Sequence, residues 1–184
     1  MYDTVVLKLL KEDIGDKYDW RSVFNKIDQT SEYKQVEGGS GHINGLRVSV
    51  TEKHVRVTGS LSKYFSGTNL DSLTLSQVEK AIKQLGKELG VPMIEADVER
   101  VDMAENFEMS RPPEFYISKM QSLGECCPNK WKGTTYFPSN GVLLRFYDKS
   151  KEVRKKRKNQ KNTPGAFSTS VEQNLLRYEI CFGK

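Results

Sequence analysis

Two neighbouring segments of this sequence alternate apolar and polar residues, and this pattern constrains the fold more than any other feature. They are residues 46–50 and 54–58, with only Thr-Glu-Lys between them. Residues 134–137 and 142–147 suggest a second hairpin around the turn sequence Pro-Ser-Asn-Gly. A period of two is typical of strands with one buried face, and short polar connections join such strands as hairpins. The sequence therefore predicts an antiparallel sheet with one apolar face.

Helical segments separate the predicted strands. Thr74-Leu-Ser-Gln77 fits a capping box, and apolar residues then recur at helical spacing until Gly90 supplies the stop. A second helix opens at Pro112 and Pro113, with the apolar residues Phe115, Tyr116, Met120 and Leu123. Asp19 is the predicted cap of a short helix that carries Val23, Phe24 and Ile27. Further strands are predicted over residues 3–10, 94–109 and 175–182, and residues 35–45 are predicted to form a glycine-rich loop.

This order of elements predicts an α+β fold, an antiparallel sheet with helices packed on one face and with the active site on the open face. The chain has 184 residues, which suits a single domain over residues 1–184 with a basic flexible segment at 149–165. Three cysteines, two of them adjacent, do not make a disulfide framework. No signal peptide or membrane-spanning run is recognisable, so we expect a cytoplasmic protein without a membrane partner.

Three predicted strands share one polar pattern. An arginine is followed two residues later by a chemically capable group in Arg100-x-Asp102, Arg145-x-Tyr147 and Arg177-x-Glu179. Because side chains two positions apart point to the same face of a strand, each pair lies opposite the apolar face. If these strands are neighbours, two carboxylates, a phenol and three guanidinium groups gather on the open face of the sheet.

Those groups are the components needed to cleave a phosphodiester by transesterification. Two carboxylates, Asp102 and Glu179, could hold a divalent metal ion such as Mg²⁺ or Mn²⁺. Such an ion polarises a phosphoryl oxygen, and a tyrosine can act as the nucleophile. The arginines Arg100, Arg145 and Arg177 suit phosphate oxygens because a guanidinium offers paired donors. The alternative for each pair is an ordinary cross-strand ion pair on a half-exposed strand.

The segments that carry these residues resemble ordered motifs of a known family. They are the start Met-Tyr-Asp-Thr, residues 100–107 (RVDMAENF), residues 141–149 (GVLLRFYDK) and residues 176–179 (LRYE). In order and spacing they are similar to the phage and plasmid replication initiators of the gene II/X type, which include the filamentous-phage nicking proteins. The resemblance spans nearly the whole chain.

The resemblance implies a metal-dependent, site-specific DNA endonuclease that nicks and closes one strand to initiate rolling-circle DNA replication. The nucleophile of the family's Tyr-x-Lys motif falls on Tyr147, with Lys149 as a second catalytic residue. Attack would leave a free 3′-OH and a covalent 5′-phosphotyrosine. Asp102 and Glu179 fall on the acidic positions that we assign as metal ligands. The implied partners are single-stranded or supercoiled origin DNA and a host helicase and polymerase, in the cytoplasm of a bacterial host of a phage, plasmid or other mobile genetic element.

The chain departs from the family pattern in two respects. Many related initiators bind metal through two histidines one residue apart, whereas His42 and His54 form no such pair, so a third ligand is not identified. Relatives also tend to continue past the last motif, whereas this chain ends five residues after Glu179. We therefore expect either a natural short form or a chain whose C-terminal region is missing.

Basic residues crowd the segment that follows the tyrosine. Next to Lys149 and Lys161 they include Lys151, Arg154, Lys155, Lys156, Arg157 and Lys158. The segment is predicted to be a loop or a frayed helix, and it could neutralise the phosphates of the strand being attacked. Nuclear localisation is the other usual meaning of such a run. Elsewhere Lys63 could contact a nucleic-acid backbone while Tyr64 stacks on a base, although the ring suits a protein core equally.

A rival hypothesis has a different functional class: a non-catalytic DNA- or RNA-binding module with the same basic surface. Such a module should keep its nucleic-acid affinity in Asp102→Asn and Glu179→Gln and show no dependence on Mn²⁺. An interaction domain that does not bind nucleic acid is a third option, and it predicts no affinity for DNA even at low salt.

Overall fold

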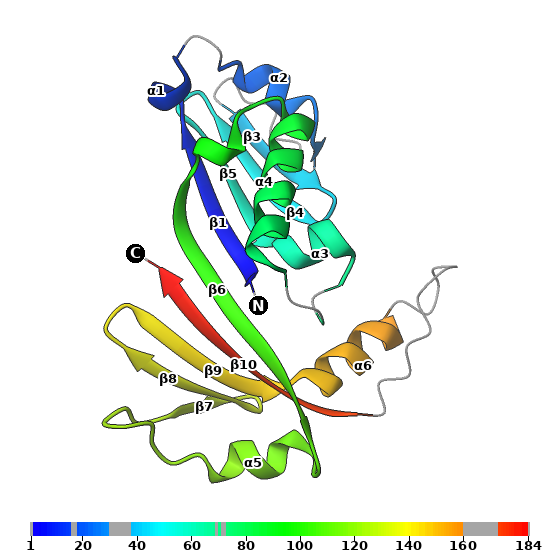
Figure 1. The fold of residues 1–184 in the computed structure, drawn as a ribbon, viewed down its shortest axis with the longest axis vertical. Helices are drawn as coiled ribbons and strands as arrows, with labels where there is room; N and C mark the ends of the chain where they lie inside the picture. Colours follow the sequence, from blue (N-terminus) through cyan, green and yellow to red (C-terminus); the bar gives the residue numbers. More distant parts are fainter. Residues whose placement is uncertain are drawn as a thin grey trace. The chain divides into compact units, whose positions relative to one another are not determined.

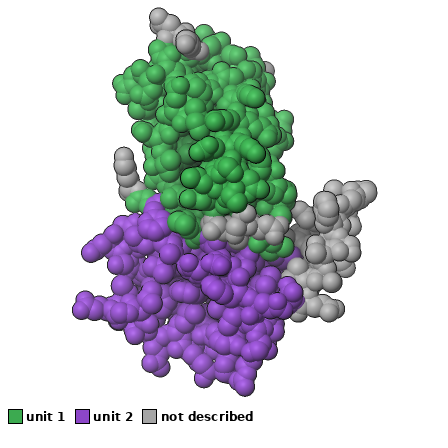
Figure 2. Space-filling model, viewed as in Figure 1, with its two compact units in different colours: residues 1–103, 183–184 green, residues 104–182 purple. Residues whose placement is uncertain are grey.

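The structure is a computed structural model that describes residues 2–15, 18–29, 38–68, 70, 73–159 and 173–183. The chain forms two compact units, residues 1–103 with 183–184 and residues 104–182, which Figure 2 colours separately. Strand β6 (Asp97–Met109) runs from the first unit into the second. Both units combine antiparallel strands with helices, so the α+β class is confirmed. The assignment of residues 1–184 to one nickase domain stays a prediction, and each unit is described by itself.

The first unit contains an antiparallel sheet in the order β2-β3-β4-β5-β1-β6. Its strands are β1 (Tyr2–Leu10), β2 (Asp28–Gln29), β3 (Gly38–Ile43), β4 (Leu46–Thr51), β5 (His54–Ser60) and the first part of β6. Strands β4 and β5 pair as the predicted hairpin, with Val48 opposite Val57. Both valines are fully buried, because the alternation of apolar residues turns one face of each strand toward the core.

Helices α2 (Trp20–Phe24), α3 (Leu61–Ser66) and α4 (Leu75–Leu89) cover one face of this sheet (Figure 1). A short helix α1 (Lys11–Ile14) follows β1, and the 3₁₀ helix η2 (Met93–Glu95) precedes β6. The core between sheet and helices is built from the apolar stripe of α4 and the inward residues of the strands. Helices on one face of the sheet are therefore confirmed for this unit.

The ends of α4 form as the sequence predicts. The Thr74 hydroxyl accepts from the Gln77 backbone N–H, and the Gln77 side chain accepts in return from the Thr74 N–H at 2.8 Å. Gly90 ends the helix in the left-handed region with φ of 75°. A capping box satisfies two backbone donors that the first helical turn leaves open, and glycine adopts the left-handed conformation without a steric penalty.

The predicted loop at residues 35–45 is wrong for its second half, because residues 38–43 form strand β3. The strand pairs with β4, and Gly41 lies opposite Val48. The glycines of this segment led to the prediction of a loop, because glycine is rare in strands and common in loops. They are needed for close packing: a Cβ at Gly39 would lie 2.2 Å from the Phe24 ring, and one at Gly41 would lie 2.3 Å from the Asp28 carbonyl oxygen.

The second unit contains the last part of β6, followed in the sheet by β10, β9, β8 and β7. The bounds are β7 (Asn129–Trp131), β8 (Thr134–Ser139), β9 (Val142–Asp148) and β10 (Asn174–Gly183). Helices α5 (Pro113–Lys119) and α6 (Lys149–Asn159) complete the unit (Figure 1). Strands β8 and β9 form the second predicted hairpin, with Phe137 opposite Leu144.

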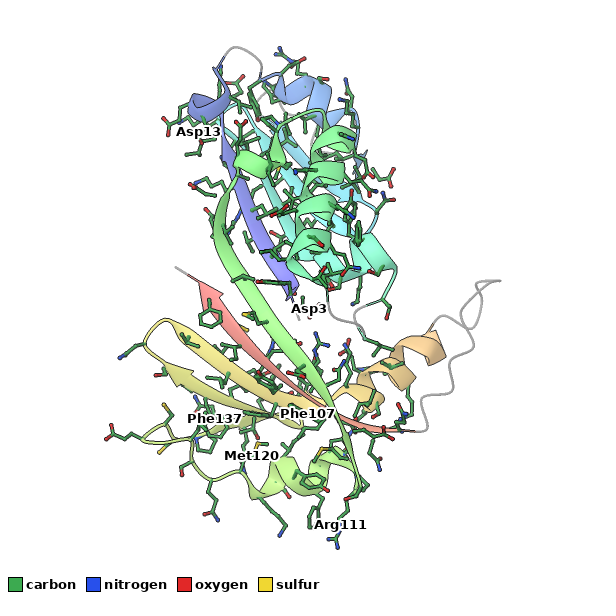
Figure 3. The ribbon with its side chains drawn as sticks, in the orientation of Figure 1. Asp3, Asp13, Phe107, Arg111, Met120 and Phe137 are labelled. Atoms are coloured by element: carbon green, nitrogen blue, oxygen red, sulfur yellow. The ribbon has the colours of Figure 1, made fainter. Side chains whose placement is uncertain are left out.

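A row of aromatic rings crosses the sheet of the second unit. Phe137 of β8 meets Phe146 of β9 edge to face, with ring centroids 5.9 Å apart. Phe146 stacks on Tyr178 of β10 at 6.0 Å, and Tyr178 stacks on Phe107 of β6 at 5.9 Å. Phe107 and Phe137, the ends of the row, are labelled in Figure 3. Aromatic pairs on neighbouring strands stabilise a sheet and fix its register.

One helix prediction for this unit needs correction. Helix α5 ends at Lys119, so Met120 and Leu123 are not part of it. Met120 is extended, and Leu123 forms an isolated bridge with Cys126. The basic segment, predicted as a loop or a frayed helix, is helical over 149–159, because lysine and arginine are good helix formers and hydrogen bonds fix the start of the helix. Residues 160–172, which include Lys161, lie outside the described part of the chain.

Among the described residues, no helix combines the length and the apolar character that crossing a membrane requires.

The core of the first unit should be far more sensitive to truncation than its surface. Leu85→Ala in α4 removes a fully buried side chain, so we expect it to cost about 2–5 kcal/mol of the free energy of unfolding. Leu75→Ala makes the same substitution in the same helix at a side chain that is 64% exposed, and it should change stability by no more than about 0.5 kcal/mol. Urea denaturation of both variants measures the difference, and equal losses would contradict the packing described here.

Candidate functional site

Pairing of β9 with β10 brings four of the predicted polar groups together. Tyr147 lies opposite Arg177, and Arg145 lies opposite Glu179. Because paired residues point to the same face of a sheet, these four side chains gather opposite the aromatic row. The alternation in the sequence predicted this grouping for both strands.

The Glu179 carboxylate is the centre of this cluster. Its Oε1 atom accepts a hydrogen bond from the Tyr147 hydroxyl at 2.7 Å and another from Arg177 Nε at 2.7 Å. Its Oε2 atom accepts from Arg145 Nε. A further nitrogen of Arg177, Nη1, donates to the Asn106 side-chain oxygen at 3.2 Å. One carboxylate therefore holds two guanidinium groups and a phenol in fixed positions.

Two charged members of the cluster are buried, which the predicted open face did not anticipate. Glu179 is 2% exposed and Arg177 is 0% exposed. Tyr147 is half-buried. Residues of this kind leave water only when they are paired and hydrogen-bonded, and here each charged group has its partner within the cluster. Alternation in the sequence showed which side chains share a face, but it could not show how deeply each of them is buried.

The first turn of α6 closes over the tyrosine. Lys149 is buried, and its ammonium nitrogen lies 5.9 Å from the centroid of the Tyr147 ring and 2.9 Å from a Glu152 carboxylate oxygen. Lys149, predicted as a second catalytic residue, is thus beside Tyr147. Glu152 was missed by the sequence analysis, because i, i+3 contacts become visible only once the segment is known to be a helix.

Local hydrogen bonds fix where this helix begins. The Asp148 side chain accepts from the Lys151 backbone N–H at 2.8 Å, as helix-capping carboxylates do. The Ser150 hydroxyl donates to the Gln173 carbonyl at 2.8 Å and accepts from the Leu175 N–H at 2.6 Å. The start of α6 is therefore anchored to the start of β10, which places Lys149 reproducibly against the tyrosine.

Burial raises the pKa of the Tyr147 phenol well above its usual value. The negative charge of Glu179 and the hydrogen bond to it raise this pKa further, whereas the positive charge of Arg177 opposes the shift. The phenol is therefore protonated at neutral pH. Any reaction in which Tyr147 is the nucleophile needs a group that takes the phenol proton.

Asp102 belongs to the first unit and is held by the arginine of its own motif. The Arg100 Nε and Nη2 atoms donate to the two carboxylate oxygens of Asp102 at 2.7 and 2.8 Å. Asp102 is fully buried, whereas the Arg100 side chain is 41% exposed. The placement of Asp102 and Glu179 in one metal site stays a prediction, because each unit is described by itself.

Arginines contact both predicted metal ligands. Every oxygen of the two carboxylates accepts from a guanidinium, so their negative charge is balanced. Each oxygen keeps a further lone pair, so these contacts leave both carboxylates able to ligate Mg²⁺ or Mn²⁺. Cys181, buried on the same side of β10 as Glu179, was missed as a neighbouring group although its spacing would have found it.

The predicted nucleic-acid contacts fall into three groups. Lys63 is exposed on α3, while Tyr64 is buried in the core of the first unit, so the stacking role considered for Tyr64 is wrong. Lys151, Arg154 and Lys155 are exposed on α6. The side chains of Lys156, Arg157 and Lys158 lie outside the described part of the structure. Arg177 is buried and holds Glu179, so its contacts support a positioning role.

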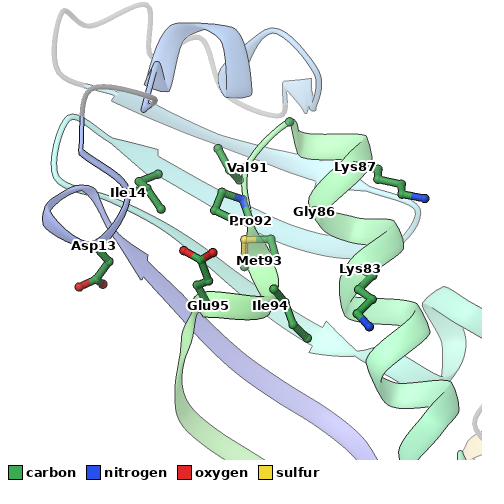
Figure 4. A pocket seen from close by; sticks show the side chains of 11 residues that line it. Asp13, Ile14, Lys83, Gly86, Lys87, Val91, Pro92, Met93, Ile94 and Glu95 are labelled. Atoms are coloured by element: carbon green, nitrogen blue, oxygen red, sulfur yellow. The ribbon is translucent and has the colours of Figure 1, made fainter.

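A hollow of about 700 Å³ in the first unit lies beside α4 and η2 (Figure 4). Gly86, Val91, Pro92, Met93 and Ile94 contribute to its wall. Its lining also includes Asp13, Ile14, Lys83, Lys87, Gly90 and Glu95. None of these eleven residues is among the predicted catalytic, metal-binding or nucleic-acid-binding residues, and we assign the hollow no catalytic role.

Comparison with known families gives a match that spans the chain. The family described as the N-terminal region of the phage replication-associated protein of the gene II type matches residues 1–184. No curated protein matches the chain.

Removing the charge of Glu179 should destabilise the second unit. Glu179→Gln removes the carboxylate charge that faces the buried Arg177 guanidinium, which we expect to cost about 3–5 kcal/mol of the free energy of unfolding. The matched control is Glu114→Gln, which removes an exposed ion pair with Lys151 at 3.5 Å and should cost less than about 1 kcal/mol. Thermal and urea unfolding measure both. If both variants lost a similarly small part of the free energy of unfolding, the charge of Glu179 would not be needed to keep Arg177 buried.

The Tyr147 phenol should resist ionisation. We expect it to remain protonated at pH 10, where an ordinary tyrosine is about half ionised, because burial and the Glu179 charge both raise its pKa. Glu179→Gln removes one of these causes and should lower the pKa toward the usual value. The measurement is the phenolate absorbance against pH, taken as the difference between the chain and Tyr147→Phe. A Tyr147 that ionises at or below pH 10 would contradict the described environment.

Proposed function

Because the chain belongs to the family of phage replication-associated proteins of the gene II type, and is therefore a replication initiator of the predicted kind, we propose that it nicks and rejoins one strand of origin DNA through Tyr147. This activity would start rolling-circle replication in the cytoplasm of a bacterial host. The single observation that carries the proposal is the 2.7 Å hydrogen bond from the Tyr147 hydroxyl to Glu179.

That hydrogen bond supplies what a buried phenol lacks. A tyrosine becomes an effective nucleophile when a neighbouring base takes its proton, and the Glu179 oxygen lies at the distance at which proton transfer occurs. The described contacts therefore favour Glu179 as the proton acceptor over its predicted role as a metal ligand. Arg177 and Arg145 fix the carboxylate in the geometry that this role requires.

The proposed step balances as a transesterification. The Tyr147 oxygen forms a bond to phosphorus while the bond from phosphorus to the 3′ oxygen breaks. The phenol proton passes to Glu179 and the departing 3′ oxygen takes a proton from solvent, so a free 3′-OH and a 5′-phosphotyrosine result. Glu179 then releases its proton to solvent, which restores the balance. A later attack by a 3′-OH on the phosphotyrosine reverses the step and closes the strand.

Two cations of the site suit the negative charge of the reacting phosphate. Lys149 lies beside the Tyr147 ring, and Arg145 is partly exposed to solvent while it contacts Glu179. Preorganised positive groups stabilise the charge that develops on a phosphoryl group in the transition state. The exposed cations of α6, Lys151, Arg154 and Lys155, follow directly in the chain and would bind the phosphates on either side of the cleaved bond.

A divalent metal ion remains a predicted requirement of this activity. The family resemblance implies it, whereas the described carboxylates have their charge balanced by arginines. We therefore derive no step through the ion and leave the requirement to experiment. A host helicase and polymerase are the further partners that a nicked origin with a free 3′-OH would engage.

The proposal predicts a covalent protein–DNA adduct. Single-stranded DNA from a set of candidate origins, incubated with the chain and Mn²⁺, should give an adduct that survives denaturing electrophoresis. The adduct should disappear in Tyr147→Phe, because this substitution removes only the attacking oxygen. A chelator added in place of Mn²⁺ tests the metal requirement in the same assay.

Tyr136 provides the matched control. It lies opposite Arg145 in the pairing of β8 with β9, so it is on the same side of the sheet as Tyr147 and one strand away. Tyr136→Phe should leave the adduct intact. An adduct that persists in Tyr147→Phe but is lost in Tyr136→Phe would show that Tyr136 is the nucleophile and contradict the proposal. If no origin sequence gives an adduct, a non-catalytic nucleic-acid-binding module is favoured.

A further inference from the structure

Trp131 on β7 is a large aromatic side chain that the fold leaves in solvent. It is 63% exposed, whereas Trp20, the other tryptophan of the chain, packs against the core of the first unit. A single exposed ring is common on protein surfaces, so its surroundings decide whether it has a role. For Trp131 the pairing of the strands supplies these surroundings.

The strand register places Trp131 on the face of the sheet that carries the tyrosine. Trp131 lies opposite Thr134 of β8, and Thr134 lies opposite Tyr147 of β9. Paired residues of an antiparallel sheet point to the same face, so these three side chains form one row across the sheet. Neighbouring strands are about 4.8 Å apart, which puts the Trp131 position roughly 10 Å from that of Tyr147.

A two-residue turn holds Trp131 at the end of β7. Lys132 and Gly133 join β7 to β8 with φ values of 47° and 80°, and positive φ at both positions is typical of the type I′ turns that suit antiparallel hairpins. The Lys132 ammonium lies 4.4 Å from the centroid of the Trp131 ring. The exposed ring therefore has a cation beside it.

The face between Trp131 and Tyr147 lacks negative charge. A second row beside the first runs from Asn129 through Tyr136 to Arg145, whose side chain is 29% exposed. In the part of these two rows that the structure describes from β7 to β9, the ionisable groups are two phenols and the Arg145 guanidinium. An aromatic face without acids, with cations at both ends, suits an anionic strand.

We propose that Trp131 stacks on a base of the single strand that Tyr147 attacks, while Lys132 neutralises a phosphate of the same strand. Every base has an apolar face, so an exposed indole binds a nucleotide whatever its identity. Successive bases of a stacked strand are about 3.4 Å apart, so a span of roughly 10 Å places the stacked base within about three nucleotides of the reacting phosphate. Trp131 is thus a positioning residue for the proposed reaction.

This inference deepens the proposed function and rests on it for the identity of the reacting phosphate. Stacking itself needs neither the Tyr147 oxygen nor a metal ion. Binding of the strand can therefore be measured in a chelator, apart from formation of the adduct, and failure of stacking and failure of nicking give different results.

Tryptophan fluorescence measures the stacking. The chain is titrated with an oligodeoxythymidine in the presence of a chelator, and in Trp20→Phe the emission comes from Trp131 alone. We expect the oligonucleotide to quench this emission, whereas the Trp20 emission that remains in Trp131→Phe should be unchanged. Trp131→Ala should weaken binding about tenfold, the usual effect of removing a stacked ring.

Two control residues lie on the opposite face of the same sheet. Phe182 of β10 is 39% exposed and shares the face of Tyr178, so Phe182→Ala removes an exposed ring away from the proposed contact and should leave affinity unchanged. Lys130 alternates with Trp131 and donates to a carbonyl of α5. Lys132→Gln should reduce the slope of log K against log salt by about 0.7, and Lys130→Gln should leave this slope unchanged.

An adduct assay with abasic nucleotides tests the position of the stacked base. One abasic site is placed in turn at each of the three nucleotides on either side of the cleaved bond. We expect one of these positions to slow adduct formation about tenfold in the unaltered chain. The same abasic site should have no further effect in Trp131→Ala, because this variant has already lost the contact.

Binding of the oligonucleotide that leaves the Trp131 emission unchanged, or equal affinity in Trp131→Ala and Phe182→Ala, would overturn the inference. Abasic sites whose effects are the same with and without the Trp131 ring would overturn it as well. Quenching together with weaker binding in Trp131→Ala, but with no adduct from the unaltered chain, would instead remove the proposed nicking activity and keep Trp131 as a contact for the strand.

Discussion

The buried ion pair between Arg177 and Glu179 is the interaction on which the candidate site depends. A guanidinium removed from water is costly unless its charge is balanced, and Glu179 balances it from the same strand at 2.7 Å. The remaining donors and acceptors are used as well, by Asn106, Arg145 and Tyr147. Since every group has its partner, the network specifies one arrangement of β9 against β10 and with it one position for the tyrosine oxygen.

That arrangement decides the protonation state of the tyrosine before any substrate arrives. Burial and the charge of Glu179 keep the phenol neutral, so the hydroxyl is stored as a hydrogen-bond donor. The Glu179 carboxylate, which suppresses ionisation of the Tyr147 phenol, is also placed to accept the phenol proton when the oxygen bonds to phosphorus. A phosphate that draws Arg145 away from Glu179 would remove one of the cations that the carboxylate contacts, which would couple the arrival of the substrate to the release of Glu179 as proton acceptor.

Much of the fold and part of this site could be predicted from the sequence. Alternation identified both hairpins and placed Arg145 with Tyr147 and Arg177 with Glu179 on one face, because side-chain direction in a strand depends only on parity. Parity carries no information about what covers a face, so the burial of Glu179 and the contact of Lys149 with Tyr147 were not predictable. Strand β3 was missed for a related reason: its glycines are selected by close contacts with Phe24 and Asp28 that exist only in the folded chain.

The second unit separates the groups that would do chemistry from those that would hold the strand. The Glu179 network offers a nucleic acid little exposed charge, so it contributes little to affinity, and its substitution would change the rate of cleavage more than binding. The cations of α6 are exposed and contribute no group to the reacting centre, so they would set affinity and salt dependence. A half-buried nucleophile beside these cations reacts only with a strand that they have already positioned, and that requirement, more than the reactivity of the phenol, would limit cleavage to a bound substrate.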